Sequence, residues 1–422
     1  MKWLRLSICA LVAFGVAAHG AVEEWARAVL EIGAGLLFLA WSVLAYRKQE
    51  QQIALSPLLP PLGALLVVVL AQWLLGRTAS SYDTAQELQL LLADLLVLFV
   101  AAQVFRTVAE FRGMVWFLMT FGFVVALEGI LQHLTFNGKL YWFREMHFGG
   151  IPFGPYVNRN HFAGFAELVI PASLVPLVLG KVRRERWFVV SLLAVVPIGA
   201  LFMSASRGGI VSFGVEVGAL LIWLVVRRSA GRHLLSAAAV LGLAFVMVSW
   251  LGVRQALERF SAMQSLEVTQ GKRTSMAADS WHIFLDHPWT GTGLGTLQDV
   301  FPAYETQYDG RIVNHTHNDY LEALAETGLA GGLCCAWFLG TLLWESLRKL
   351  AQERGGFAAT VRLSGVVACL GFLTHSLVDF NLHIPANALL FFLLAHLATG
   401  DMRSSLEGAT EDSRARYRLR KQ

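Results

Sequence analysis

The chain has 422 residues, of which 55% are hydrophobic and 15% are charged, and its formal net charge is +4. A chain this apolar cannot surround a core with a polar surface, so its composition excludes a water-soluble globular protein. The small positive charge is distributed over the loops between apolar segments and gives no indication of a nucleic-acid partner. We therefore expect an integral membrane protein.

Apolar runs close to the roughly 20 residues that cross a bilayer recur along the whole chain. The first run, "MKWLRLSICALVAFGVAAHGA", has the features of a secretory signal, but in a chain with many such runs we expect an uncleaved first helix. The pattern predicts an all-α, polytopic membrane protein. We count about twelve transmembrane helices, centred near residues 12, 37, 66, 96, 123, 171, 196, 218, 243, 336, 370 and 392.

Lys and Arg residues mark alternate loops of this series. Most of the 34 lie near the N-terminus, in every second loop or in the tail that begins at Arg403. Because short loops rich in Lys and Arg are retained in the cytoplasm, we expect both termini to be cytoplasmic. The basic tail is expected to contact anionic lipid headgroups.

This topology divides the chain into five segments. They are residues 1–134 with the first five spans, 135–252 with the next four spans and an outer loop at 135–160, 253–328 as a large outer loop, 329–402 with the last three spans, and 403–422 as the basic tail.

The large outer loop contains a predicted short helix. Residues Ser275 to Asp286 have the pattern of apolar and polar residues of a short amphipathic helix. Thr274 or Ser275 is its predicted N-cap, and "DHP" is expected to end it. Such a helix is expected to lie along the membrane interface. Its predicted apolar side consists of Met276, Trp281, Phe284 and Leu285. The three glycines that follow, Gly291, Gly293 and Gly295, permit a tight turn and close approach of the backbone to a partner.

The polar stretch "RIVNHTHNDYLEALAETGLAGG" follows, from Arg311 to Gly332. Asp319 and Glu322 have the spacing of a capping box, so we predict a helix that begins near Asp319. His317 then lies just outside a helix N-terminus, where the helix dipole favours a neutral imidazole. Asp319, Glu322 and Glu326 share one face of this helix. Their mutual repulsion requires nearby cations, for which we expect arginines.

Several cationic side chains are available for such a site. They are Arg159 in "NRNH", Arg207 in "SRGG", and Lys272 with Arg273 in the large outer loop. A guanidinium group is always charged and can bind two oxygens of a phosphate or carboxylate. Arginines that converge from several loops predict a site for a strongly anionic group at the membrane surface, such as a lipid-linked diphosphate.

Structural alternatives exist for each of these residues. His317 can simply order its loop, and arginines at the interface can extend to lipid phosphates. Asp379 and His383 can satisfy the turn between the last two spans. "HTHND" places His315, His317 and Asp319 close together, but alternate residues on irregular backbone rarely bind a metal without a further ligand. We therefore expect no metal.

With these residues identified, the chain resembles the O-antigen ligase and polymerase superfamily of bacterial membrane glycosyltransferases. The similarity extends from about Pro152 onward. Its motifs are "NRNHFAG", "SRGG", a loop arginine followed by "DHPWTGTGLG", "HNDYLEALAETGLAGG" and "DFNLHIPAN". In the fourth motif, His317 and Asn318 are followed by Gly328 and Gly331.

The resemblance implies a C-type glycosyltransferase fold in the bacterial inner membrane, with a large periplasmic loop and a periplasmic active site. The donor would be a glycan on undecaprenyl diphosphate, the acceptor a lipid A core sugar or another glycan, and the transfer would invert the anomeric centre without a metal or other cofactor. His317 corresponds to the base, and Arg207 and Arg273 to the residues that hold the diphosphate. Arg159 and Asn160 would support them. His315 lies beside the motif and is a second candidate for the base.

Other functions fit parts of the same sequence. Within the family, the chain can instead be an O-antigen or exopolysaccharide polymerase, or a protein O-oligosaccharyltransferase. Outside it, the acids within predicted spans, Asp94 and Glu216 especially, are what a proton-coupled transporter of lipid-linked sugars would use. The concentration of polar residues in the outer loops favours an enzyme.

Overall fold

Helices account for the regular secondary structure of the protein in the computed structural model, which describes residues 1–48, 52–146, 150–227, 238–246, 249, 270–353 and 355–402. Within these ranges there is no β-strand, and only two isolated β-bridges occur, at Leu140 with Arg144 and at Phe153 with Tyr156. The all-α prediction is confirmed for this part of the chain.

The named helices follow one another along the chain in this order: α1 (Lys2–Ala17), η1 (His19–Ala21), α2 (Glu24–Lys48), α3 (Leu59–Leu74), α4 (Ser81–Val104), α5 (Val108–Leu134), α6 (Arg159–Val178), α7 (Arg184–Ser204), α8 (Arg207–Val226), α11 (Gln270–Asp286), α12 (Leu297–Val300), η3 (Phe301–Ala303), α13 (Asp319–Gln352), α14 (Gly356–His375), η4 (Asn381–His383) and α15 (Pro385–Thr399).

Eight of the described helices are long and apolar enough to cross a membrane, namely α2, α4, α5, α6, α7, α8, α13 and α14. The chain is a multi-pass membrane protein. Helices α3 and α15 are apolar but shorter. Eleven of the predicted span centres fall in named helices, and the centre near 243 falls in the helical residues 238–246. The total of twelve spans stays a prediction, and the tail 403–422 and residues 250–269 of the large loop lie outside the described residues.

Helix α6 forms the centre of the helical bundle. Its apolar window is entirely buried, and it packs against α5, α7, α8, α14 and α15. By contrast, only 22% of the corresponding window of α2 and 28% of that of α13 are buried. A membrane helix can leave apolar side chains exposed because lipid covers them. The polar residues at the start of α6 are therefore held inside the protein.

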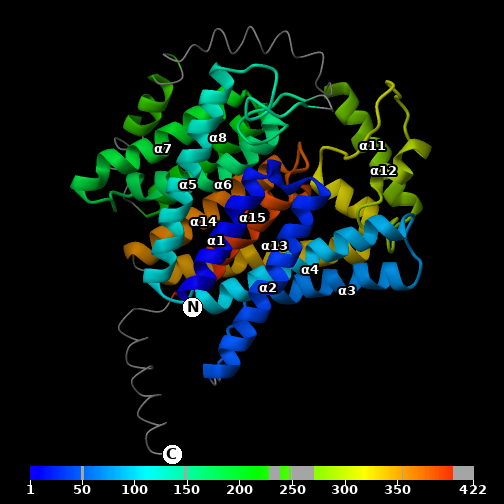
Figure 1. Cartoon of the computed structure of the whole chain (residues 1–422), viewed down its shortest axis with the longest axis horizontal. Coiled ribbons are helices and arrows are strands. Elements are labelled where there is room, and N and C mark those ends of the chain that lie inside the picture. The colour runs from blue at the N-terminus through cyan, green and yellow to red at the C-terminus, as the bar shows by residue number, and fades with distance from the viewer. Residues whose placement is uncertain are drawn as a thin grey trace, which may run out of the picture.

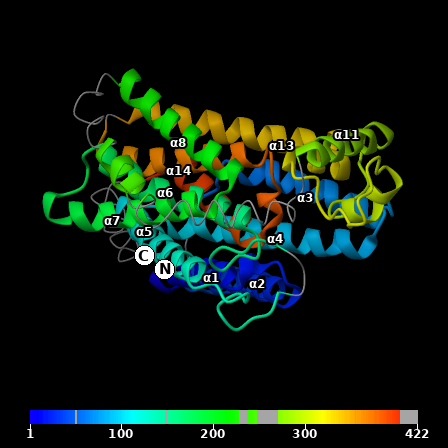
Figure 2. The same cartoon turned by 90° about the horizontal axis from the view of Figure 1, so that it is seen from above.

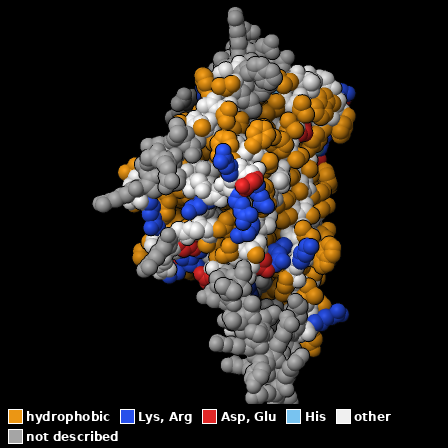
Figure 3. Space-filling view, turned by 90° about the vertical axis from the view of Figure 1, so that its left-hand side faces the viewer, with side chains coloured by type: hydrophobic (Ala, Val, Ile, Leu, Met, Phe, Trp, Pro, Cys, Tyr) orange, Lys and Arg blue, Asp and Glu red, His pale blue; other side chains and the backbone are white. Residues whose placement is uncertain are grey.

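Helices α11 and α12 lie together at one end of the molecule, beside the ends of α3 and α4 (Figures 1 and 2). The loop between α11 and α12 docks onto the protein there, since Thr84 donates to the Leu294 carbonyl and Ala79 N–H to the Thr292 carbonyl. Figure 3 shows the opposite end, where Lys and Arg side chains gather amid a largely apolar surface.

Helix α13 is broken at Gly328, which adopts φ +61° and ψ −161°. The loop before α12 fills the break: Thr292 and Gly293 N–H groups donate to carbonyls of the first half, and Leu329 N–H donates to the Pro288 carbonyl. A helix end leaves backbone groups without helical partners, and these bonds satisfy them. The first half of α13, which carries the predicted polar face, is therefore fixed to the large loop.

One detail of the predicted loop helix is wrong. The helix α11 includes Thr274 and Ser275 instead of beginning at them, because it already extends back to Gln270. Of its predicted apolar side, Met276 and Phe284 are buried in the protein, whereas Trp281 and Leu285 are exposed. Ile283 is also buried, on the helix that packs against α13 and η3.

Candidate active site

The segment between α14 and α15, residues 376–384, is the common partner of residues that are distant in the sequence. We call it the last outer loop. It contains "SLVDFNLHI" and the short helix η4. Its Ser376, Asp379 and Asn381 are all fully buried. Residues of α6, α8, α11 and the start of α13 all contact this loop.

His317 and Asp379 form a pair across this loop. Nδ1 of His317 lies 3.2 Å from Oδ1 of Asp379. Burial raises the pKa of the Asp379 carboxyl, but the hydrogen bond from His317 and the electrostatic interactions with the His317, His161 and His375 side chains outweigh burial and hold this pKa below its ordinary value. When the imidazole is neutral and Nδ1 donates its hydrogen to Asp379, Nε2 of His317 keeps a free lone pair.

The backbone at His317 is strained. Its φ is +54°, a left-handed conformation that side-chain-bearing residues rarely adopt and that tends to occur at functional sites. The next residue, Asn318, is the N-cap of α13, and its side chain accepts hydrogen bonds from the Tyr320 and Leu321 N–H groups. The Asn318 side chain also donates to the Leu377 carbonyl at 3.0 Å. The cap and the last outer loop together fix the turn that carries His317.

The predicted capping box does not form, because the N-cap is displaced by one residue. The helix begins at Asp319 as expected, but Asn318 caps it and Glu322 does not bond back to the cap. Oε2 of Glu322 instead accepts hydrogen bonds from the N–H and hydroxyl groups of Thr316, at 2.9 and 3.1 Å. Both Asn and Asp are good N-caps, which explains the error of one position.

Arg273 and the Arg207 segment reach the same loop. An η-nitrogen of Arg273, on α11, donates to the Val378 carbonyl at 3.1 Å. Ser206 is the N-cap of α8, and Arg207 is the first residue of that helix. The next residue, Gly208, lies against the loop. A Cβ added at Gly208 would be only 2.6 Å from Nε2 of His375 and 3.0 Å from the Val378 side chain. The "SRGG" glycine thus permits the close approach that brings Arg207 to this region.

The first turn of α6 meets the loop from the other side. Arg159 and Asn160 are buried there. The ring of His161 contacts the Phe380 ring at 4.8 Å, and the Asn387 side chain donates to the His161 carbonyl. The structure therefore brings the "NRNH" motif to the last outer loop, as the sequence analysis expected for a shared site.

Histidines accompany the acids of α13. His383 is held between Asp319, with Nδ1 at 2.9 Å from Oδ1, and Glu322, with Nε2 at 3.3 Å from Oε1. His315 Nδ1 lies 2.6 Å from the same Oε1 of Glu322. Burial disfavours a charged His383, but Glu322 and Asp319 outweigh burial and raise its pKa well above the ordinary value. These two histidines lie where the sequence analysis expected arginines as partners of the acids.

Lys272 is not brought to the last outer loop. Its ammonium group lies 2.6 Å from Glu305 and 3.4 Å from Asp309, and it also donates to the Gln307 carbonyl. These contacts hold the segment after η3 to α11. The positive charge of Lys272 is thus balanced within the large loop.

Two residues that the sequence analysis left as turn residues, Asp379 and His383, are central to the arrangement. A third, His375, ends α14 with Nδ1 at 3.0 Å from the buried Glu167 of α6. The available signal was the segment "HSLVDFNLH" itself, in which two histidines and an aspartate interrupt an apolar region.

Residues 168–336 match the sequence model of the family described as O-Antigen ligase. This match to part of the chain supports membership of the O-antigen ligase superfamily. No curated protein matches the chain. The matched segment begins within α6 and ends within α13, so it includes Arg207, Arg273 and His317.

The match to the O-antigen ligase family suggests a glycosyltransferase-like enzyme in a membrane context, with lipid-linked glycans as the substrate class. The last outer loop lies beyond the matched segment. The contacts described above therefore join the matched O-antigen ligase segment to α14 and α15, which complete its polar centre.

Proposed function

We propose that this protein transfers a preassembled glycan from undecaprenyl diphosphate to an acceptor hydroxyl, such as that of a lipid A core sugar, on the periplasmic face of a bacterial inner membrane. The observation that carries the proposal is the pairing of His317 with Asp379 on the loop that Arg273 also contacts. The proposed base, His317, and the permanently charged Arg273 thus both contact the last outer loop.

In the proposed reaction, the acceptor oxygen attacks the anomeric carbon of the donor sugar as Nε2 of His317 takes its proton. The bond between the anomeric carbon and the phosphate oxygen breaks, and undecaprenyl diphosphate leaves with the electron pair. A single displacement of this kind inverts the anomeric centre. Asp379 keeps the imidazole oriented and stabilises the imidazolium that forms, as in other base-carboxylate pairs.

Arg273 and Arg207 are proposed to bind the diphosphate. Negative charge grows on the bridging oxygen as the bond breaks, and fixed positive charge at that position lowers the barrier. Arg159 and Asn160 support this binding from the start of α6. Asn318 fixes the turn of His317 through its bond to the Leu377 carbonyl.

The charge distribution supports the proposed orientation. Lys and Arg gather at the end of the molecule shown in Figure 3, opposite α11 and α12 (Figure 1). Cytoplasmic segments retain Lys and Arg. This gathering of Lys and Arg supports the proposal that this end faces the cytoplasm and that the large loop with the candidate site faces the periplasm.

A transfer assay with the two arginine variants tests the proposal. Purified protein would receive an undecaprenyl-diphosphate glycan and an acceptor, and the release of undecaprenyl diphosphate and the identity of the glycan product would be measured. Each hydrogen bond to a charged group contributes about 1.5–3 kcal/mol. Arg207→Ala and Arg273→Ala should therefore lower the rate at low donor concentration by about 10–100-fold, with Arg→Lys partly restoring it.

Arg348→Ala is the matched control, because Arg348 lies near the far end of α13 and pairs with Glu345. It should retain the wild-type rate. If both test variants had the same transfer rate as the control, neither Arg207 nor Arg273 would bind the donor diphosphate. A product with several joined repeat units would identify a polymerase, and a glycosylated protein would identify a protein O-oligosaccharyltransferase.

Asp379→Asn tests the positioning role of the carboxylate. An amide can donate to Nδ1 and so stabilise the wrong tautomer of His317, and we expect kcat to fall on the order of 10²-fold or more while the KM for the donor stays the same. Asp379→Glu should restore part of kcat. Asp309→Asn, at an exposed aspartate of the large loop, serves as control. An unchanged kcat in Asp379→Asn would mean that the carboxylate has only a structural role.

A further inference from the structure

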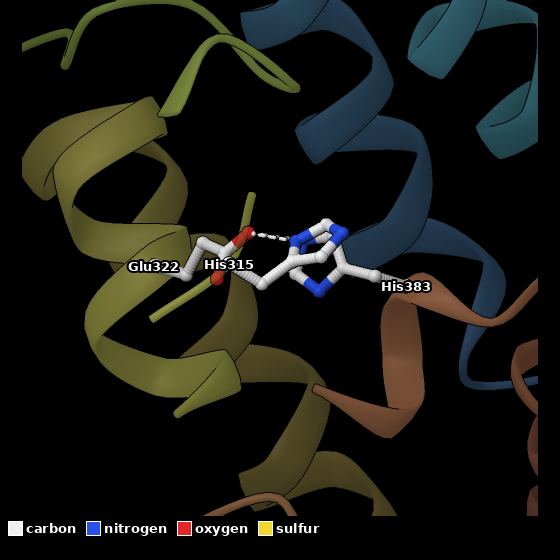
Figure 4. A group of neighbouring side chains, drawn as sticks. All are labelled: His315, Glu322 and His383. Carbon is white, nitrogen blue, oxygen red and sulfur yellow. Dashed lines mark hydrogen bonds and ion pairs between the residues drawn. The ribbon is translucent and has the colours of Figure 1, made fainter. Parts of the chain in front are cut away.

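Three potential metal ligands converge near the candidate base. Nδ1 of His315, a carboxylate oxygen of Glu322 and a ring nitrogen of His383 all lie within 4.8 Å of one another. Figure 4 shows the three side chains pointing toward one another from the loop before α13, from α13 itself and from η4. No other group of this kind is found in the part of the chain that the structure describes.

Neighbouring residues orient two of these ligands. Asp319 Oδ1 lies 2.9 Å from Nδ1 of His383, which directs Nε2 of that ring toward Glu322. Thr316 occupies Oε2 of Glu322 with two hydrogen bonds, which leaves Oε1 facing the two imidazoles. A histidine ligand whose second nitrogen bonds a carboxylate is the usual arrangement in zinc sites.

The acids of the cluster are buried. The carboxylates of Asp319 and Glu322 both lie away from solvent, where a carboxylate is costly without a positive partner. A divalent ion bound beside them would offset their charge. Glu326, one turn further along α13, is buried as well, and its Oε2 has no hydrogen-bond partner.

We propose that His315, Glu322 and His383 bind a divalent transition-metal ion of the zinc class. Two imidazole nitrogens and a carboxylate oxygen are a donor set that suits zinc better than magnesium or calcium. Tetrahedral zinc ligands lie roughly 3.3 Å apart, as Nε2 of His383 and Oε1 of Glu322 already do at 3.3 Å. His315, with 29% of its side chain exposed, has room to shift outward to the same spacing.

This site replaces the expectation that the "HTHND" segment binds no metal. The ligands that the segment lacked are Glu322 and His383, which only the folded chain brings to it. The ion is not part of the proposed transfer step. The His315 ring stacks on Phe380 at 4.3 Å, and the His317 ring contacts the same Phe380 at 4.9 Å. A bound ion would therefore fix the segment that carries the base.

Cobalt binding tests the site without any activity measurement. Full-length protein in detergent would be stripped with a chelator and titrated with Co²⁺, whose visible absorption reports a low-coordinate site with nitrogen ligands. We expect one strongly absorbing Co²⁺ per chain, displaced by Zn²⁺. His383→Ala and His315→Ala should abolish this absorption, and Asp319→Asn should weaken binding by about 10–100-fold.

His282→Ala is the matched control, since His282 is an exposed histidine on α11. It should bind Co²⁺ as the wild type does. Thermal melting of each variant would distinguish loss of the metal site from loss of the fold. The His315→Ala variant is the decisive one, because the His315 side chain is partly exposed and its removal should leave the fold intact. Wild-type protein without this absorption, or absorption that persists in folded His315→Ala, would overturn the proposal.

Discussion

His317→Ala is expected to lower kcat for glycan transfer by about 10²–10⁴-fold, the usual contribution of a positioned general base. The donor KM should change little, because the imidazole acts on the acceptor proton and the arginines bind the diphosphate. Single-turnover measurements with purified protein and saturating donor would isolate the chemical step.

The control for this variant is His287→Ala, which removes an exposed imidazole from the loop that follows α11. Its kcat should equal that of the wild type. If His317→Ala retained wild-type turnover while His315→Ala lost it, the base would be His315. Metal binding by the His317→Ala protein should persist, so this result and the cobalt titration are independent.

Gly328→Ala should cause the largest loss of stability among single glycine substitutions in α13. The φ and ψ of Gly328 fall in a region that is essentially restricted to glycine, where another residue costs about 1–3 kcal/mol. An added Cβ would also lie 2.6 Å from the Thr290 and Gly291 backbone nitrogens. We expect a lower melting temperature, detached loop residues 288–293 and reduced transfer.

Gly340→Ala is the matched substitution in the same helix, since a Cβ there meets no atom within 4 Å. It should leave the melting temperature unchanged or raise it slightly, because alanine is the better helix former. Melting followed by size-exclusion fluorescence in detergent would measure both variants. Equal melting temperatures would show that the break in α13 does not depend on glycine.

The helices could be predicted from the sequence because the property that defines them is local. An apolar run of sufficient length must form a helix in lipid, since no other partner exists for its backbone groups. The helix termini could be predicted less accurately where two neighbouring residues can each act as the N-cap. Asn318 and Asp319 can each cap a helix, and only the fold decides that Asp319 is needed by His383 instead.

The candidate site could be predicted only in part, because residue type indicates the chemistry of a group but not its partner. His317, Arg207 and Arg273 were identifiable from their motifs. The pairing of His317 with Asp379 spans 62 residues of sequence, which periodicity does not reveal. The acids of α13 required positive partners, and the sequence offered arginines and histidines alike. The packing of η4 against α13 supplied His383.

The last outer loop also determines when the site can assemble during biosynthesis. It follows the segments that carry His317 and the arginines, so the ribosome delivers those residues before Asp379, the partner of His317, exists. The polar centre can close only after the terminal helical hairpin, α14 with α15, has entered the bilayer. Insertion of that hairpin is thus the step that converts a membrane-embedded chain into one capable of catalysis.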